Sequence, residues 1–209
     1  MIGPTLIRHF ATGWARTRGV PPPIVDGHAL RIEVGQPDQI RRFVFPAPPA
    51  GIAEVGTRID QPGILLKTWI DPEVVQALLP PCWHVEQTGT MMTLDALPTG
   101  AAPLADGFTL ELDDRSDVVA VQVTAADGAP AARGLLTVID GWALHDRIHV
   151  EARYRRLGLG RAAMQSLGAE GARRGAQHGI LAATDMGRAL YQSIGWQARA
   201  PWTTAQIMP

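Results

Sequence analysis

Two periods of hydrophobic residues run along the chain, one typical of helices and one typical of strands. Residues 4–18 are predicted to form a helix, because their apolar side chains recur at helical spacing: Leu6, Ile7, Phe10 and Trp14. The following residues predict strands at 29–34, 64–69 and 83–94, helices at 37–45 and 72–79, and a loop over 46–56. This alternation predicts an N-terminal α/β lobe that covers residues 1–100.

A segment rich in Pro, Ala and Gly over residues 96–107 predicts a linker, and the pattern after it is more regular. Three β-rich segments follow, at residues 118–124, 132–139 and 142–150. The pairs Asp127-Gly128 and Asp140-Gly141 separate them, and Asp-Gly is typical of tight hairpin turns. A helix over 161–175, a strand over 179–183, a helix over 185–194 and a final segment to Met208 complete the series. We therefore predict a second domain over residues 105–209, built on an antiparallel meander.

One face of the predicted helix at 161–175 consists largely of small residues. Its members follow the helical period: Met164, Leu167, Gly168, Gly171, Ala172 and Gly175. Because each glycine weakens a helix by about 1 kcal/mol relative to alanine, three of them on one face favour close packing against a sheet. An accident of composition is the alternative interpretation.

Composition and charge narrow the class of protein. The chain has 209 residues, 46% of them hydrophobic, and a formal net charge of -1, which favours neither nucleic acid nor an anionic membrane surface. No apolar run reaches the roughly 18 residues of a membrane-spanning helix, and the first residues are too polar for a signal peptide. Cys82 is the single cysteine, which excludes an intrachain disulfide. These features predict a cytoplasmic protein without a nucleic-acid or membrane partner.

The strongest chemical signal is a basic, glycine-rich turn between the strand at 142–150 and the helix at 161–175. It reads Arg155-Arg156-Leu157-Gly158-Leu159-Gly160 and is followed by Arg161. The first N–H groups of a helix lack intrahelical partners, and glycine lets the backbone come close to an anion. Arginine adds permanent positive charge, and residues 145–174 hold seven arginines against three acidic residues. We predict a pyrophosphate site at this turn.

A dinucleotide-binding fold is the competing interpretation. The segment Gly158-Leu159-Gly160-Arg161-Ala162-Ala163 also fits the fingerprint G-x-G-x-x-A, with Asp185 after a later strand. However, Asp185 lies 27 residues after Gly158 rather than about 20, and only 24 residues follow it. Strands joined by tight hairpins are antiparallel, whereas that fold needs parallel strands joined by crossovers. We therefore favour an antiparallel sheet.

Two segments resemble the signatures of the GNAT N-acetyltransferase superfamily. Residues 148–164, IHVEARYRRLGLGRAAM, are similar to its acetyl-CoA motif, and residues 187–196, GRALYQSIGW, are similar to its second signature. Ala152 stands where that family usually has Pro, and Arg156 stands where it usually has Gly. An Asn common in the family is absent near Thr184-Asp185. The resemblance covers about residues 107–200 and does not extend into residues 1–100.

The resemblance implies a fold and a cosubstrate. The fold class is α/β (α+β), with a mixed, mostly antiparallel central sheet flanked by helices and a splayed strand pair that takes coenzyme A. The pantetheine arm would pair with the strand backbone at Ile148 and Val150. The pyrophosphate would lie against Arg155, Arg156, Leu157, Gly158, Leu159, Gly160 and Arg161. Acetyl-CoA is the implied cosubstrate, and no metal is implied.

The chemistry requires a proton acceptor for the amine and a proton donor for the departing thiolate. Its place in the second signature implies that Tyr191 presents its hydroxyl to the sulfur, and a core aromatic is the alternative. On the strand, His145, Asp146 and His149 are candidates for the base. Regular alternation would place His145, Arg147 and His149 on one face. A surface or structural role is the alternative for each histidine.

The predicted function is transfer of an acetyl group from acetyl-CoA to a primary amine by direct attack. The predicted catalytic residues are Tyr191, His149 and His145. The run Glu111, Asp113 and Asp114 is more typical of a solvated edge, and Cys82 of packing than of an acyl-carrying nucleophile. Two other functions stay open: a non-catalytic sensor of acyl-CoA, and an interaction module in the N-terminal lobe. A homodimer is also compatible with the sequence.

Overall fold

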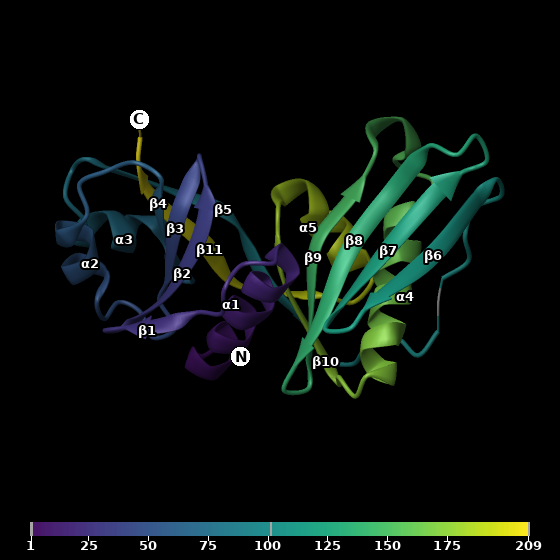
Figure 1. The fold of residues 1–209 in the computed structure, drawn as a ribbon, viewed down its shortest axis with the longest axis horizontal. Coiled ribbons are helices and arrows are strands. Elements are labelled where there is room, and N and C mark those ends of the chain that lie inside the picture. Colours follow the sequence, from purple (N-terminus) through teal and green to yellow (C-terminus); the bar gives the residue numbers. More distant parts are fainter. Residues whose placement is uncertain (1, 101, 209) are drawn as a thin grey trace. The chain divides into compact units, whose positions relative to one another are not determined.

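The computed structural model describes residues 2–100 and 102–208. It is a mixed α/β protein in which mostly antiparallel strands are flanked by helices, as predicted (Figure 1). Two compact units divide the chain. The first comprises Met1–Met92, Ala182–Arg188 and Ala198–Pro209, and the second comprises Thr93–Leu181 and Ala189–Gln197. The chain therefore returns to its first unit at its end.

The first unit contains most of the N-terminal elements. In chain order they are α1 (Pro4–Arg18), β1 (Ile24–Asp26), β2 (Ala29–Gln36), β3 (Gln39–Val44), α2 (Ile52–Arg58), β4 (Ile64–Thr68), α3 (Pro72–Leu78) and β5 (Trp83–Leu94), joined by β11 (Gln197–Ile207). The strands follow the order β1-β2-β3-β4-β11-β5. β3 and β4 run parallel, since α2 connects them as a crossover, and β11 lies antiparallel to β4.

Helix α1 forms as its apolar spacing predicts. The four residues that define the spacing are all buried: Leu6, Ile7, Phe10 and Trp14. The ring of Phe10 meets Trp202 of β11 edge to face, with 5.1 Å between centroids. The guanidinium of Arg42 lies 3.7 Å from the centroid of the Trp14 ring. The helix therefore covers the face of the sheet to which the side chain of Arg42 belongs.

The helix predicted over residues 37–45 is wrong, because this segment forms the strand β3. It pairs with β2 from Leu30↔Val44 to Gln36↔Gln39, and with β4 on its other side. Residues 37–38 form the turn between β2 and β3. Pairing with two neighbouring strands overrides the local preference of the segment. The loop predicted over residues 46–56 is also wrong in part, since α2 begins at Ile52.

The second unit contains the predicted meander. Its elements are β6 (Phe108–Arg115), β7 (Val118–Ala125), β8 (Pro130–Ile139), β9 (Trp142–Val150), the short 3₁₀ helix η1 (Ala152–Tyr154), α4 (Leu159–Arg173), most of β10 (His178–Ala183) and the second half of α5 (Asp185–Ser193), while residues 182–188 belong to the first unit. The strands follow the order β10-β9-β8-β7-β6, and only β9 and β10 in this series run parallel. Asp140 and Gly141 turn the chain between β8 and β9 with φ angles of 45° and 79°. The antiparallel pairings contradict a doubly wound dinucleotide-binding fold.

Helix α4 packs against β7, β8 and β9 through its small residues (Figure 1). A Cβ atom added at Gly171 would lie 3.0 Å from the Cβ atom of Ala143 on β9. One added at Gly168 would lie 2.7 Å from Pro98. Close packing is therefore confirmed at these two glycines. Gly175 lies beyond the helix with a φ angle of 86°, so it takes no part in this face.

Candidate functional site

The parallel pairing of β9 with β10 covers only the first part of β9. Three residue pairs form the ladder, and the last of them is Leu144↔Ile180. β9 continues to Val150, and within the described residues no further pair with β10 follows. Among the described residues, the ladder with β10 therefore does not continue along residues 145–150 of β9. The predicted splayed strand pair is present, and its free edge can accept an extended ligand as an added strand.

A bulge interrupts β9 within this free stretch. Arg147 has a φ angle of 54°, and the pairing with β8 shifts between Arg133 and Leu135. Asp146 stands opposite Leu135 and His149 stands opposite Arg133, so β9 holds one residue more than β8 there. An extra residue reverses the alternation of side chains beyond it.

The bulge changes which predicted residues share a face. The prediction that His145, Arg147 and His149 lie on one face is wrong, because His145 and His149 fall on opposite sides of the bulge. Ile148 packs against the hydrophobic cluster that contains Leu167 of α4. His145 lines a pocket together with Met164 of α4, so it faces the same helix. Asp146 and His149 point to the other face of the sheet, away from α4. The two faces of β9 therefore carry different chemistry.

The glycine turn leads from η1 into α4. Arg156 and Gly158 adopt left-handed φ angles of 64° and 77°, and Gly158 is the N-cap of the helix. No side chain caps this end by a hydrogen bond, and the first turn holds no acidic residue. A Cβ atom added at Gly160 would lie 2.9 Å from Leu190 of α5 and 3.3 Å from Val150. The helix therefore presents uncapped N–H groups and the positive end of its dipole, the features of an anion site.

The arginines of the turn lie at the surface around this helix end. The Nε atom of Arg155 donates to the carbonyl oxygen of Val150 at 3.4 Å, and Nη2 of Arg161 donates to that of Ser193 at 3.4 Å. Arg156 and Leu157 are exposed in the same turn. Arg173 and Arg174 lie at the other end of α4, where both bind Glu170. Those contacts lower the pKa of Glu170 to about 2, with the bond from Arg173 as the largest cause.

Tyr191 is buried on α5, with 7% of its surface exposed. Its ring centroid lies 6.3 Å from that of Trp196, whose backbone N–H donates to the carbonyl oxygen of Tyr191 at 3.0 Å. Burial raises the pKa of Tyr191 to about 12, and the negative charge of Asp146 adds to the effect. The phenol is therefore protonated at neutral pH. The side chains of Leu190 and Val150 both lie against Gly160, so α5 lies beside the end of β9.

The two predicted histidines have different environments. His145 is 4% exposed, and burial lowers its pKa to about 4, against the opposing effect of the carbonyl groups of Ala143 and Met164. Such an imidazole stays neutral at pH 7 and is a weak base. His149 is partly exposed, and its Nε2 atom lies 3.4 Å from a carboxylate oxygen of Glu151. The structure brings His145 and His149 onto one strand but not into one cluster.

Asp146 was a candidate among several in the sequence, and the fold gives it a distinct place. It lies at the bulge, where its carboxylate accepts a hydrogen bond from the backbone N–H of Arg147 at 2.9 Å. Regular alternation would have grouped it apart from His149, and only the bulge brings both to one face. No periodicity in the sequence signals this.

The remaining candidates lie elsewhere. Glu111, Asp113 and Asp114 belong to the edge strand β6, where Asp113 pairs with Arg115 at 2.6 Å. Asp114 pairs with Arg174 at 2.7 Å. Cys82 is exposed and belongs to the first unit. Among the described residues, no group of His, Cys, Asp and Glu side chains has the composition of a metal site. None of the described helices has the length and hydrophobicity of a membrane span.

Comparison with known proteins gives a consistent result. The model of the acetyltransferase (GNAT) family matches residues 84–196. A GCN5-related N-acetyltransferase from Kribbella flavida is 14% identical with a TM-score of 0.68, covering 100% of this chain and 97% of that one. One from Sphaerobacter thermophilus is 13% identical with a TM-score of 0.61, covering 99% and 93%. A tandem GNAT protein from the clavulanic acid biosynthesis pathway is 15% identical with a TM-score of 0.56, covering 90% and 82%. No curated protein matches the chain.

Proposed function

Because the chain belongs to the acetyltransferase (GNAT) family, we propose that it is an N-acyltransferase that moves an acyl group from acyl-CoA, such as acetyl-CoA, to a primary amine. One observation supports this above the others. The uncapped N-terminus of α4 follows the free edge of β9 after η1 and the glycine turn, so one ligand can engage a phosphate site and a strand edge together. Coenzyme A carries both a pyrophosphate and an amide-bearing arm.

The proposed binding mode uses this chain's backbone. The N–H groups of residues 158–161 would hold the pyrophosphate, with Arg155, Arg156 and Arg161 supplying charge and Leu157 and Leu159 shaping the turn. The pantetheine amides would pair with the free edge of β9 at Ile148 and Val150. A backbone N–H near Val150 would then polarise the thioester carbonyl.

In the proposed reaction, the neutral amine attacks the thioester carbonyl carbon, and the thiolate leaves. Tyr191 would donate its hydroxyl hydrogen toward the sulfur. A phenol with a pKa of about 12 is a much weaker acid than a thiol, whose pKa is about 8.5. A hydrogen bond that stabilises the thiolate therefore fits this tyrosine better than complete proton transfer. We assign the base on the amine side to His149 or Asp146, directly or through water, because both face away from α4.

Thermal stability in the presence of ligands tests the proposed cosubstrate. Acetyl-CoA is expected to stabilise the fold by about 2.7 kcal/mol at 100 times its dissociation constant, and NADH is expected to have no effect. Release of free coenzyme A is then measured with a panel of primary amines. Binding without release from any amine would support a sensor of acyl-CoA. Stabilisation by NADH alone would contradict the proposal.

The Tyr191→Phe variant is expected to lower turnover about 10- to 100-fold with little change in affinity for acetyl-CoA, since only the hydroxyl is lost. General acids and bases typically contribute about 100-fold to 10,000-fold to a rate. The expected loss does not exceed the lower limit of that range, because the raised pKa of Tyr191 weakens its donation. Steady-state coenzyme A release measures it. Tyr154→Phe is the matched control, as Tyr154 is the other tyrosine of the chain and packs against Phe108. Equal turnover in all three proteins would leave Tyr191 as a core aromatic.

A further inference from the structure

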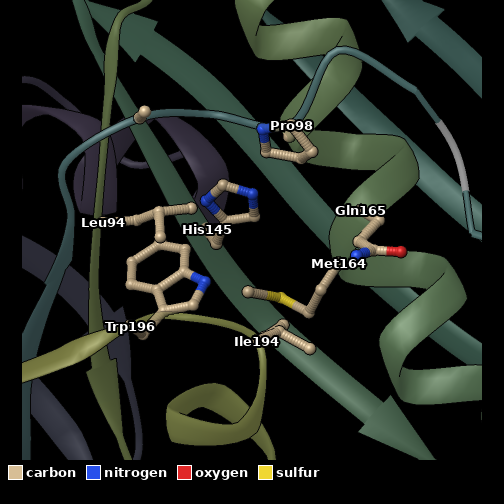
Figure 2. A pocket seen from close by; sticks show the side chains of 9 residues that line it. Leu94, Pro98, His145, Met164, Gln165, Ile194 and Trp196 are labelled. Carbon is tan, nitrogen blue, oxygen red and sulfur yellow. The ribbon is translucent and has the colours of Figure 1, made fainter.

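The second unit contains a cavity of about 120 Å³ that the binding mode above does not use. It lies between α4, the segment at residues 94–98 and the residues that follow α5 (Figure 2). Its walls are mainly apolar, formed by Leu94, Pro98, Met164, Ile194 and Trp196. An engineered apolar cavity of about 150 Å³ in another protein binds benzene, so this one has room for about five or six carbon atoms.

Two polar side chains also line the cavity: Gln165, which is partly exposed, and His145, which is buried. Only 4% of the surface of His145 is exposed, and Figure 2 shows its imidazole between Pro98, Trp196 and Met164. Its Nε2 atom is buried and makes no hydrogen bond to any described residue. Its Nδ1 atom lies 3.3 Å from the carbonyl oxygen of Ala143. In the tautomer that donates from Nδ1 to the carbonyl of Ala143, the neutral ring leaves Nε2 as an acceptor. The cavity therefore suits an apolar group that carries one hydroxyl.

The position of His145 relates the cavity to the acyl donor. His145 directly follows Leu144, the last residue of β9 that pairs with β10, so it stands at the closed end of the free edge. The ring of Trp196 lies 5.2 Å from that of His145 and 6.3 Å from that of Tyr191, between centroids. If the thioester sulfur lies at Tyr191, the acyl substituent would thus be separated from the cavity only by the ring of Trp196.

We propose that this cavity receives the acyl chain of the donor, a short chain of about four to six carbons with a hydroxyl that donates to His145. The inference rests on the proposed function and names its donor class. The chain enters on the α4 face, and the amine approaches from the face of Asp146 and His149. The transfer is otherwise unchanged: a C–N bond forms, the C–S bond breaks, the amine loses one proton and the thiolate gains one.

Calorimetry tests the proposal without any acceptor amine. It measures the affinities of the protein for coenzyme A and for acetyl-, butanoyl-, hexanoyl-, dodecanoyl- and 3-hydroxybutanoyl-CoA. Affinity is expected to rise up to about fourfold for each methylene from acetyl to hexanoyl, and to fall for dodecanoyl. The 3-hydroxybutanoyl donor is expected to bind at least as well as butanoyl. A flat series with tight binding of coenzyme A would overturn the acyl cavity and leave the proposed function standing. No binding by any of these molecules would overturn both.

Two variants locate the effect. Ile194→Phe fills the cavity from its rim, so the ratio of hexanoyl to acetyl affinity is expected to fall at least tenfold. His145→Phe removes the acceptor, so the hydroxyl of 3-hydroxybutanoyl-CoA is expected to become unfavourable relative to butanoyl-CoA. Leu112→Phe, on the exposed side of β6, is the control that keeps both ratios. Unchanged ratios in the two cavity variants, with the wild-type preference intact, would place the chain elsewhere and overturn the proposal.

Discussion

The Lys67→Met variant is expected to unfold at pH 7 with a free energy about 2–4 kcal/mol higher than the wild-type protein. Lys67 lies on β4 with 7% of its surface exposed. Burial, as the largest cause, and the charge of Arg42 together lower its pKa from 10.5 to about 7, against the opposing effect of Glu86. One unit of pKa corresponds to about 1.4 kcal/mol, so holding this amine in the fold costs several kcal/mol at neutral pH. Methionine fills a similar volume without a charge.

The surroundings of Lys67 tolerate the loss of its amine. The Nζ atom donates to the hydroxyl oxygens of Thr88 and Thr204. These two hydroxyls also lie 2.6 Å apart and bond to each other, and that of Thr88 donates to the carbonyl oxygen of Trp202 at 3.2 Å. Neither hydroxyl is left unsatisfied by the substitution. Replacing a buried charged group by an apolar side chain is often stabilising when no remaining polar group loses its hydrogen-bond partner.

The sign of the pH dependence follows from the lowered pKa. Between pH 7 and 10.5 the unfolded chain binds a proton at Lys67 that the folded chain does not. The free energy of unfolding of the wild-type protein therefore rises with pH relative to that of the variant, by about 1.4 kcal/mol per pH unit. This gain is lost again as the pH falls toward 7. Urea unfolding of both proteins at pH 7.5, 8.5 and 9.5 measures the narrowing difference. Arg8→Met, at an exposed position of α1, is the control whose profile stays parallel to the wild type. A constant difference for Lys67→Met would show that the buried amine keeps its proton.

Local signals predicted the second unit well, because each acts over a few residues. The Asp140-Gly141 turn takes the left-handed φ angles that a tight hairpin needs, and β8 and β9 follow from it. The small residues Gly168 and Gly171 recur at helical spacing and pack closely, as the pattern indicates. The uncapped start of α4 at Gly158 likewise matches the glycine turn.

Long-range pairing explains what the sequence did not predict in the first unit. β3 carries no strong strand pattern alone, and its pairing with both β2 and β4 decides its structure. The final segment was recognised, but nothing in its residues indicated that Thr204 would pair with Lys67 on β4. Partners so distant in the chain leave no trace in local periodicity.

The candidate site was predictable in its phosphate turn and not in its side-chain faces. Arg147 takes a positive φ angle without being glycine, so the bulge has no sequence signature. That single residue separates His145 from His149 and brings Asp146 to the face of His149. The cavity beside His145 was equally hidden, because its walls come from segments at residues 94–98, 145, 164–168 and 194–196.

The Gly160→Asp variant is expected to lose at least 100-fold in affinity for coenzyme A while keeping its fold. Gly160 is in the first turn of α4, where a carboxylate interacts favourably with the helix dipole. The same carboxylate would occupy the N–H groups proposed for the pyrophosphate and repel its charge. Hydrogen bonds to charged groups contribute about 1.5–3 kcal/mol each, so losing one or two accounts for the expected factor.

A matched pair of variants separates the charge from the volume. An added Cβ atom would already lie 2.9 Å from the end of the Leu190 side chain, so part of any loss is steric. Gly160→Asn has the size of Gly160→Asp without its charge and is expected to bind coenzyme A at least tenfold more tightly than the Asp variant. Because exposed charges are screened within about 10 Å at 0.1 M salt, this difference should shrink as ionic strength rises. Calorimetry at two salt concentrations, with circular dichroism to confirm folding, measures it. Equal affinities for the wild type and both variants would place the pyrophosphate away from the start of α4.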